Sequence, residues 1–286
     1  MKIITTRNEL AEVLEEYRVK GQTLGFVPTM GALHAGHLSL ISASKQENDL
    51  TVCSIFVNPT QFTDARDLEL YPRPVESDTL MLQAQGVDVL FMPAAAEMYS
   101  PDEHWEIDLG GIDAMLEGEF RPGHFQGVTQ VVYKLFMLVK PDIAYFGQKD
   151  FQQFRVIDRM VDLQGLSISL VRCPIIREAD GLAMSSRNAQ LSPEMREAAV
   201  LISRALFAAE ADQAHFTVAE TTSRALKILG ESPLLTPEYF AIVDDQTLMP
   251  VGDWTDSESI IALTAVKAGT TRLIDNQYLR QVDFYS

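Results

Sequence analysis

The sequence predicts an α/β domain built on a parallel sheet, followed by a smaller α+β domain. Over the first two thirds of the chain, short apolar runs rich in β-branched residues alternate with helical patterns. Runs that are apolar throughout are typical of strands buried on both faces, and their alternation with helices indicates crossover connections. The last third instead places two helical patterns before three strand-like runs. We therefore expect a first domain over residues 1–175 and a second over 176–286.

The elements expected in the first domain follow from the apolar runs and from residues that commonly end helices. Gly86 and Gly165 each follow a helical pattern, and Pro141 follows another. The expected strands are 24–28, 51–57, 87–92, 143–146 and 167–171, and the expected helices are 36–47, 75–85, 126–139 and 150–164.

The second domain is expected to begin with a long helix. Ser192 is a good N-cap, and Pro193 stands at the first helical position, where its missing N–H does no harm. This helix extends to about residue 212, and a second spans 217–229. Strands are expected at 238–243, 259–266 and 271–275.

Composition excludes several functional classes. The chain has 286 residues, and its 23 Lys and Arg against 40 Asp and Glu give a net charge of −17. Nucleic-acid binding needs a basic stripe, which the sequence does not contain. It also lacks the apolar stretch of about 20 residues that would cross a bilayer, and its first residues lack the core of a signal peptide. Cys53 and Cys173 are too few for a disulfide framework, so we expect the cytoplasm.

Two histidines lie in the segment that follows the first predicted strand and opens a helix. His34 and His37 are three residues apart, so they share a helix face. Helix N-termini at the carboxyl ends of parallel strands are suited to binding phosphate, and Gly31 and Gly36 let a ligand approach the backbone. A zinc site is one alternative, although a third ligand is not evident in the sequence. A pair of surface histidines is another.

Three further segments carry polar groups suited to a nucleotide or a small acid. Lys149 and Asp150 follow a predicted strand and suit phosphate oxygens and Mg²⁺, although a solvated pair would look the same. Hydroxyls and an arginine at 185–187 suit a pyrophosphate, although a polar interdomain loop is common. Asn58 and Gln61 are neutral groups in an apolar stretch, and either a polar ligand or the backbone satisfies them.

Taken in order, these segments closely resemble the pantoate–β-alanine ligase family, within the superfamily of H-x-G-H nucleotidyltransferases. The resemblance covers nearly the whole chain and is densest from 24 to 192. It rests on P-T-M-G-A-L-H-A-G-H at 28–37, F-V-N-P-T-Q-F at 56–62, Y-P-R at 71–73, R-P-G-H-F-Q-G-V at 121–128, F-G-Q-K-D-F-Q-Q at 146–153, S-S-R-N at 185–188 and T-R-L-I-D-N at 271–276.

The resemblance implies a Rossmann-like first domain that binds ATP and pantoate, a second domain that acts as a lid, and a homodimer. It implies His37 as the proton donor, with His34, Lys149 and Arg187 as the other catalytic residues. Gln61 would bind pantoate and β-alanine, Gln153 would bind pantoate, and Asp78 would bind Mg²⁺. The implied ATP-binding residues are Met30, Gly31, Ala32, Leu33, His34, Ala35, Gly36, His37, Gly147, Gln148, Lys149, Asp150, Ile176, Met184, Ser185, Ser186 and Arg187.

The implied reaction is the ATP-dependent condensation of (R)-pantoate with β-alanine, a step toward pantothenate and coenzyme A, through a pantoyl-adenylate. Two other functions stay open at this point. An adenylyltransferase of the same superfamily would transfer AMP to a phosphate acceptor. A non-catalytic ATP-binding regulator would share the fold, but all four phosphate-facing residues (His34, His37, Lys149 and Arg187) are present here.

Overall fold

The computed structural model of the chain describes residues 1–100 and 102–281. The chain divides into two compact units. The first consists of Met1–Gln148 and Gln152–Pro174, and the second of Lys149–Phe151 and the chain from Ile175 onward.

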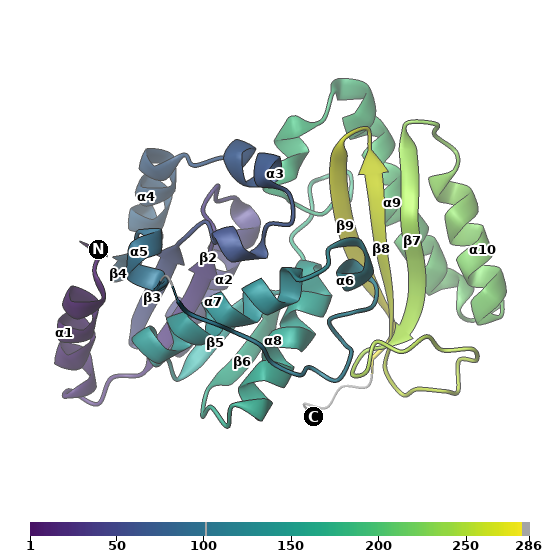
Figure 1. The fold of residues 1–286 in the computed structure, drawn as a ribbon. Coiled ribbons are helices and arrows are strands. Elements are labelled where there is room, and N and C mark those ends of the chain that lie inside the picture. Colours follow the sequence, from purple (N-terminus) through teal and green to yellow (C-terminus); the bar gives the residue numbers. More distant parts are fainter. Residues whose placement is uncertain (101, 282–286) are drawn as a thin grey trace. The chain divides into compact units, whose positions relative to one another are not determined.

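The first unit contains a six-stranded parallel sheet with the order β1-β4-β3-β2-β5-β6 (Figure 1). This confirms the predicted α/β class. The strands are β1 (Lys2–Ile4), β2 (Leu24–Thr29), β3 (Leu50–Ile55), β4 (Val89–Phe91), β5 (Ile143–Gly147) and β6 (Ser169–Cys173).

Helices cover both faces of this sheet, because neighbouring strand residues point to opposite sides. On one face Val27 and Cys53 belong to a core that includes Leu40 and Leu82 from two of the helices. On the other face Phe26 and Phe136 make an edge-on ring contact at 6.3 Å. The helices are α1 (Arg7–Arg18), α2 (Ala35–Glu47), α3 (Ala65–Leu70), α4 (Val75–Ala84), α5 (Ala95–Met98), α6 (Glu117–Phe120), α7 (His124–Val139) and α8 (Phe151–Leu163), with short 3₁₀ turns η1 (Pro59–Gln61) and η2 (Gln148–Asp150).

The five strands predicted for this region are all present, but several bounds differ from expectation: β4 begins at Val89 and not at 87, and β3 ends at Ile55 and not at 57. Strand β6 begins two residues later than predicted, because its register with β5 pairs Ile143 with Ser169 and Gly147 with Cys173. The helix expected from 150 starts instead with the 3₁₀ turn η2. Strand β1 and helices α1, α3, α5 and α6 were not predicted. Strand β1 has only three residues and lies at the sheet edge, so its sequence pattern is short.

The second unit is α+β, as predicted. Its antiparallel sheet has the order β7-β8-β9. Ser192 caps the first long helix by accepting the Met195 N–H, with Pro193 at the first position. Thr217 and Glu220 form a reciprocal capping box on the next helix. The elements are η3 (Ser186–Gln190), α9 (Pro193–Asp212), α10 (Val218–Leu229), β7 (Leu235–Asp244), β8 (Ile260–Ala268) and β9 (Thr271–Arg280).

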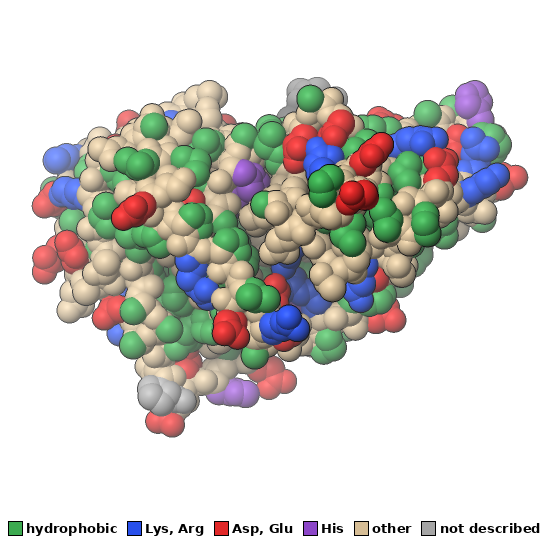
Figure 2. Space-filling model, turned by 90° about the horizontal axis from the view of Figure 1, so that it is seen from above, with side chains coloured by type: hydrophobic (Ala, Val, Ile, Leu, Met, Phe, Trp, Pro, Cys, Tyr) green, Lys and Arg blue, Asp and Glu red, His purple; other side chains and the backbone are tan. Residues whose placement is uncertain are grey.

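Charged side chains of both signs are interspersed on the face drawn in Figure 2, where the described Lys and Arg residues do not form a continuous stripe. Within residues 1–100 and 102–281, helices long and apolar enough to cross a membrane are absent.

Candidate functional site

The first unit places its candidate site at a reversal of strand order. The chain leaves β2 toward β3 on one side, and β5 later joins the other side of β2. Ligands of open parallel sheets bind in the crevice at such a point, beyond the carboxyl ends of the strands. The segment 30–37 follows β2, and Gly147 and Gln148 stand at the end of the neighbouring β5.

The two histidines of this segment cap helix α2 for each other. His34 is the N-cap, and its Nδ1 accepts the Gly36 N–H at 3.1 Å. The His34 N–H in turn donates to Nδ1 of His37 at 3.4 Å. The two rings lie 4.2 Å apart between centroids. The first turn of the helix therefore fixes both imidazoles.

These hydrogen bonds determine the tautomer of each neutral ring. Because Nδ1 of His34 and Nδ1 of His37 both accept a backbone N–H, each ring carries its proton on Nε2. Two backbone N–H groups near the helix N-terminus are used in this way. The ring Nε2–H groups are then the donors that this helix end can direct at a phosphate.

Gly36 is required by the position of the His34 ring. A Cβ at residue 36 would lie 2.8 Å from Cε1 and 2.9 Å from Nδ1 of His34. Such contacts would move the ring out of its capping position. The glycine predicted to let a ligand approach therefore also makes room for the histidine itself.

Asp78 anchors the loop before these histidines. The side chain is 1% exposed and lies in the first turn of α4. Its Oδ2 accepts the Ala32 N–H at 2.8 Å, and its Oδ1 accepts the Leu33 N–H at 2.9 Å. Ala32 has a φ of +50°, which is uncommon for a residue other than glycine. Asp78 therefore stabilises a strained turn.

Gln61 is held in place through both its backbone and its side chain. Its carbonyl oxygen lies 2.8 Å from Nδ1 of His124, and Nε2 of that ring lies 3.1 Å from the Arg121 guanidinium. Arginine can only donate, so His124 accepts at Nε2 and donates from Nδ1. The side-chain Nε2 of Gln61 lies 3.2 Å from Sδ of Met30. Gln61 and the H-x-G-H loop are thus brought together.

The two glutamines at the start of α8 differ in burial. Gln152 is buried, donates to the carbonyls of Ile112 and Met115 at 2.8 Å, and accepts the Glu117 N–H at 2.9 Å. It therefore fixes the segment before α6. Gln153, the residue predicted to bind pantoate, is half-buried on the same helix.

In the second unit, β9 holds the segment that contains Lys149. The Lys149 carbonyl accepts from Nδ2 of the buried Asn276 at 3.0 Å. Next to it, Asp275 accepts both arms of the Arg177 guanidinium, at 2.6 and 3.1 Å. The Lys149 ammonium lies 3.8 Å from Asp150 and is 18% exposed. The segment 271–276 therefore positions the backbone of Lys149.

The predicted segment 184–187 is also fixed within the second unit. The Met184 N–H donates to the Ile176 carbonyl at 2.9 Å, so these two predicted residues face each other across a turn. Ser185 caps η3 by accepting the Arg187 N–H at 3.3 Å. Asn188 ties the segment to Glu178 at 2.7 Å. Ser185, Ser186 and Arg187 are half-buried.

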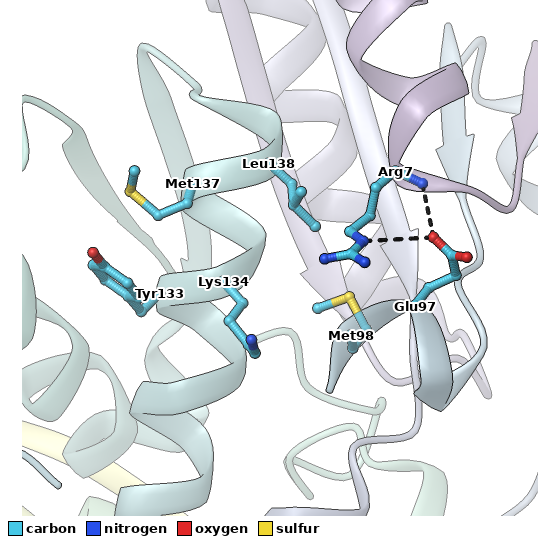
Figure 3. A pocket seen from close by; sticks show the side chains of 7 residues that line it. All are labelled: Arg7, Glu97, Met98, Tyr133, Lys134, Met137 and Leu138. Atoms are coloured by element: carbon cyan, nitrogen blue, oxygen red, sulfur yellow. Dashed lines mark hydrogen bonds and ion pairs between the residues drawn. The ribbon is translucent and has the colours of Figure 1, made fainter. Parts of the chain in front are cut away.

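Among the described residues of the first unit, hollows lie at two separate places. One, of about 260 Å³, lies beyond the ends of β2, β3 and β4, and its lining includes Met30 and Asp78. The other, of about 210 Å³, lies between α1, α5 and α7, where Arg7 pairs with Glu97 and Met98 faces Lys134 (Figure 3). The first hollow adjoins the candidate loop, so it belongs to the same end of the sheet.

Sequence reasoning missed several residues that support the site. Tyr99, Gln152 and Asn276 received no role, although Gln152 and Asn276 lie in segments already singled out. His124 also lay in a recognised motif, and a histidine there could have been flagged as buried from its apolar neighbours Phe125 and Val128. Among the described residues, no group of three or more His, Cys, Asp or Glu side chains could hold a metal ion.

Comparison with known proteins gives consistent matches over the chain. The model of the family described as pantoate-beta-alanine ligase matches residues 2–278. A protein named pantothenate synthetase from Bacteroides thetaiotaomicron is 46% identical over 282 residues, which is 99% of this chain and 100% of the relative.

Solved structures of proteins with the same names also match this chain. The crystal structure of pantothenate synthetase from Thermus thermophilus matches with a TM-score of 0.93 and 42% identity, covering 98% of this chain and 100% of that one. A pantoate-beta-alanine ligase from Francisella tularensis, complexed with beta-gamma ATP and beta-alanine, matches with a TM-score of 0.82 and 33% identity over 99% of both chains.

Proposed function

This chain belongs to the pantoate–β-alanine ligase family, and we propose that it condenses (R)-pantoate with β-alanine to give pantothenate, AMP and pyrophosphate. The catalytic roles of His34 and His37 are supported above all by their reciprocal cap, which lies where the strand order reverses. It directs two ring N–H groups from the place where such sheets bind nucleotides. The complex of the Francisella tularensis relative with beta-gamma ATP and beta-alanine supports ATP and β-alanine as substrates here.

The first step activates a carboxylate that does not react with an amine by itself. A carboxylate oxygen of pantoate attacks the α-phosphorus of ATP, and the bond to the bridging oxygen of pyrophosphate breaks. Negative charge grows on the phosphate oxygens, and fixed donors aimed at them lower the barrier. His34 and His37 donate from Nε2, and Lys149 and Arg187 supply positive charge. His37 acts as the proton donor.

In the second step the β-alanine amine attacks the acyl carbon of pantoyl-adenylate, and AMP leaves with the oxygen that came from pantoate. Gln61 binds both acids, and Gln153 binds pantoate. Water must be excluded because an acyl-adenylate hydrolyses readily. The second unit supplies Ile176 and the segment from Met184 to Arg187 to ATP, and we assign it the role of a lid.

Magnesium accompanies ATP in this proposal, but the residues present do not fit a resident metal site. Mg²⁺ prefers six oxygen ligands and keeps several waters. Asp78 is 1% exposed, and each of its carboxylate oxygens already accepts a backbone N–H. We therefore assign Asp78 to the loop rather than to direct coordination, and the phosphates of ATP would carry the ion.

Pyrophosphate release tests the first step. With ATP, Mg²⁺ and pantoate alone, we expect a burst of pyrophosphate of about one equivalent per site. Steady release of AMP should require β-alanine as well. Sustained AMP release with pantoate alone would show that water, and not the amine, takes up the acyl group, and would contradict the exclusion of water proposed here. An adenylyltransferase would instead need a phosphate acceptor and release no AMP.

We also propose that the protein is a homodimer in the cytoplasm. Family resemblance supports a homodimer, which light scattering coupled to gel filtration would test directly. The cytoplasm is the compartment proposed for an enzyme that has two free, buried thiols, Cys53 and Cys173.

A further inference from the structure

The side-chain amide of Asn58 sits between a backbone donor and a backbone acceptor. The Thr60 N–H donates to its Oδ1 at 3.4 Å, and its Nδ2 donates to the Gly127 carbonyl at 3.1 Å. A backbone N–H cannot accept, and a carbonyl cannot donate. These two groups therefore fix which end of the Asn58 amide is oxygen.

The orientation of Asn58 determines that of Gln61. Nδ2 of Asn58 also donates to Oε1 of Gln61 at 3.1 Å. Because that oxygen is used, the free rotation of the Gln61 amide is lost and its Nε2 faces the opposite way, toward Sδ of Met30. Asn58 is 1% exposed and Gln61 is 7% exposed, so water does not compete for these bonds.

Tyr99 makes the shortest hydrogen bond in this group. Its hydroxyl lies 2.6 Å from Oδ1 of Asn58, and an amide oxygen can only accept, so the tyrosine donates. Its ring is held by Phe56, at 6.3 Å between centroids, and by the Lys134 ammonium, 5.5 Å from its centroid. Burial raises the pKa of Tyr99 to about 12, so the hydroxyl keeps its proton at any assay pH near neutrality.

Helix α7 packs tightly against the turn η1 that follows Asn58. Helix α7 approaches η1 so closely that a Cβ at Gly127 would overlap the Thr60 carbonyl. That approach brings the Gly127 carbonyl to Asn58 and, one turn earlier, His124 to the Gln61 carbonyl. Helix α7 therefore holds both the backbone carbonyl of Gln61 and, through Asn58, its side-chain amide.

We propose that Tyr99 is a positioning residue for substrate binding: through Asn58 it holds the Gln61 amide so that Gln61 presents an N–H donor, and not an oxygen, to pantoate. This inference rests on the proposed function, because pantoate is the ligand that Gln61 is assigned. An N–H donor suits a carboxylate or a hydroxyl oxygen, whereas an amide oxygen would repel a carboxylate.

The direct test is Tyr99→Phe, which removes the hydroxyl and keeps the ring. We expect the KM for pantoate to rise about tenfold, the size of one lost neutral hydrogen bond, with the KM for ATP within about twofold of wild type. Tyr133→Phe is the matched control, because Tyr133 packs its ring on Trp105 and takes no part in these bonds. A pantoate KM in Tyr99→Phe equal to that of the control would overturn the proposal.

A double-mutant cycle separates positioning from general destabilisation. If Tyr99 acts through Gln61, then Tyr99→Phe should have little further effect on the pantoate KM in a Gln61→Ala background. Equal effects in both backgrounds would show that Tyr99 acts elsewhere.

The orientation of the Gln61 amide is tested by Gln61→Glu. This variant still accepts a hydrogen bond from Asn58, but an oxygen replaces the N–H donor. We expect a pantoate KM at least as high as in Gln61→Ala, and a value near wild type would contradict the stated orientation.

These outcomes are distinguishable from failure of the proposed function. If the wild-type protein releases no pyrophosphate with ATP and pantoate, the proposed ligase function is wrong. A wild type that is active, with an unaffected Tyr99→Phe variant, would remove only the positioning role.

Discussion

His37 contributes to the fold through Nδ1 and, in the proposed reaction, to phosphate binding through Nε2. The same holds for His34, so each imidazole in this loop caps the helix and, in the proposed reaction, also stabilises charge as a donor. This dual use explains why two histidines stand three residues apart beside Gly36, whose missing side chain leaves space for the His34 ring.

For His37→Ala we expect the rate of pyrophosphate release to fall about a hundredfold or more, because one fixed donor to the developing charge is removed. Rapid-quench measurement with ATP and pantoate gives this rate. His104→Ala is the control, since His104 is an exposed histidine of the same unit whose ring contacts Glu106. Normal pyrophosphate release in His37→Ala would exclude His37 from the mechanism.

Asp78 allows two roles to be separated. Asp78→Asn removes one of the two acceptor oxygens that hold Ala32 and Leu33. We expect kcat to fall about tenfold, as for loss of a charge-assisted hydrogen bond, while the free Mg²⁺ concentration for half-maximal rate stays within about twofold. Glu76→Gln, in the same helical turn but exposed, controls for the loss of charge. A strongly raised Mg²⁺ requirement would restore Asp78 as a metal ligand.

Strand β9 holds two segments that are distant from it in the sequence. Its Asp275 pairs with Arg177, and its Asn276 holds the carbonyl of Lys149. The segment Lys149–Phe151 thereby counts as part of the second unit, although the sequence places it between β5 and α8 of the first. A contact between residues 127 apart leaves no local pattern, so this assignment could not be predicted from the sequence.

The turn before η3 depends on Arg196 of α9. Its guanidinium donates to Glu178 at 2.6 Å and lies 2.7 Å from Asp180, and these contacts lower the pKa of both carboxyls. Groups with a lowered folded-state pKa stabilise the fold above their unfolded pKa, and this stabilisation is lost as the pH falls through the folded value.

Arg196→Gln should therefore lower the free energy of unfolding at pH 7 by about 1 kcal/mol or less, because both carboxylates are partly exposed and solvent screens them. The difference from wild type should shrink below about pH 4, where the carboxyls take up protons in the unfolded chain. Urea unfolding at pH 7 and pH 3 measures both values. If the difference in the free energy of unfolding is the same at both pH values, the effect of Arg196→Gln comes from lost packing of the side chain and not from its charge.

For the molecule as a whole, composition and pattern predicted both fold classes and most strands, because buried parallel strands are marked by continuous apolar runs. Strand β1 was missed since three residues carry too little pattern, and Tyr99 was missed since its partner Asn58 is 41 residues away. The local signals of the site, such as the His34 and His37 spacing, could be predicted. The hydrogen bonds that orient Gln61 depend on tertiary contacts and could not.

The two thiols provide a probe of the first unit. Burial raises the pKa of Cys53 to about 12 and that of Cys173 to about 11, and both side chains lie in the parallel sheet. Thiolate is the reactive form, so the native protein should resist iodoacetamide at pH 8. Mass spectrometry in rising guanidinium should show both thiols alkylated at the transition that Trp105 fluorescence reports in a Trp254→Phe variant. Alkylation of the native protein would contradict this burial.

The most direct measurement of the proposed reaction follows the oxygen atoms of pantoate. Pantoate labelled with ¹⁸O in its carboxylate is turned over with ATP, Mg²⁺ and β-alanine, and the products are analysed by mass spectrometry. If pantoyl-adenylate is the intermediate, one labelled oxygen passes to the phosphate of AMP, and the other stays in the amide of pantothenate. AMP without label, or label in pyrophosphate or inorganic phosphate, would contradict an adenylate and the assignment of residues around it.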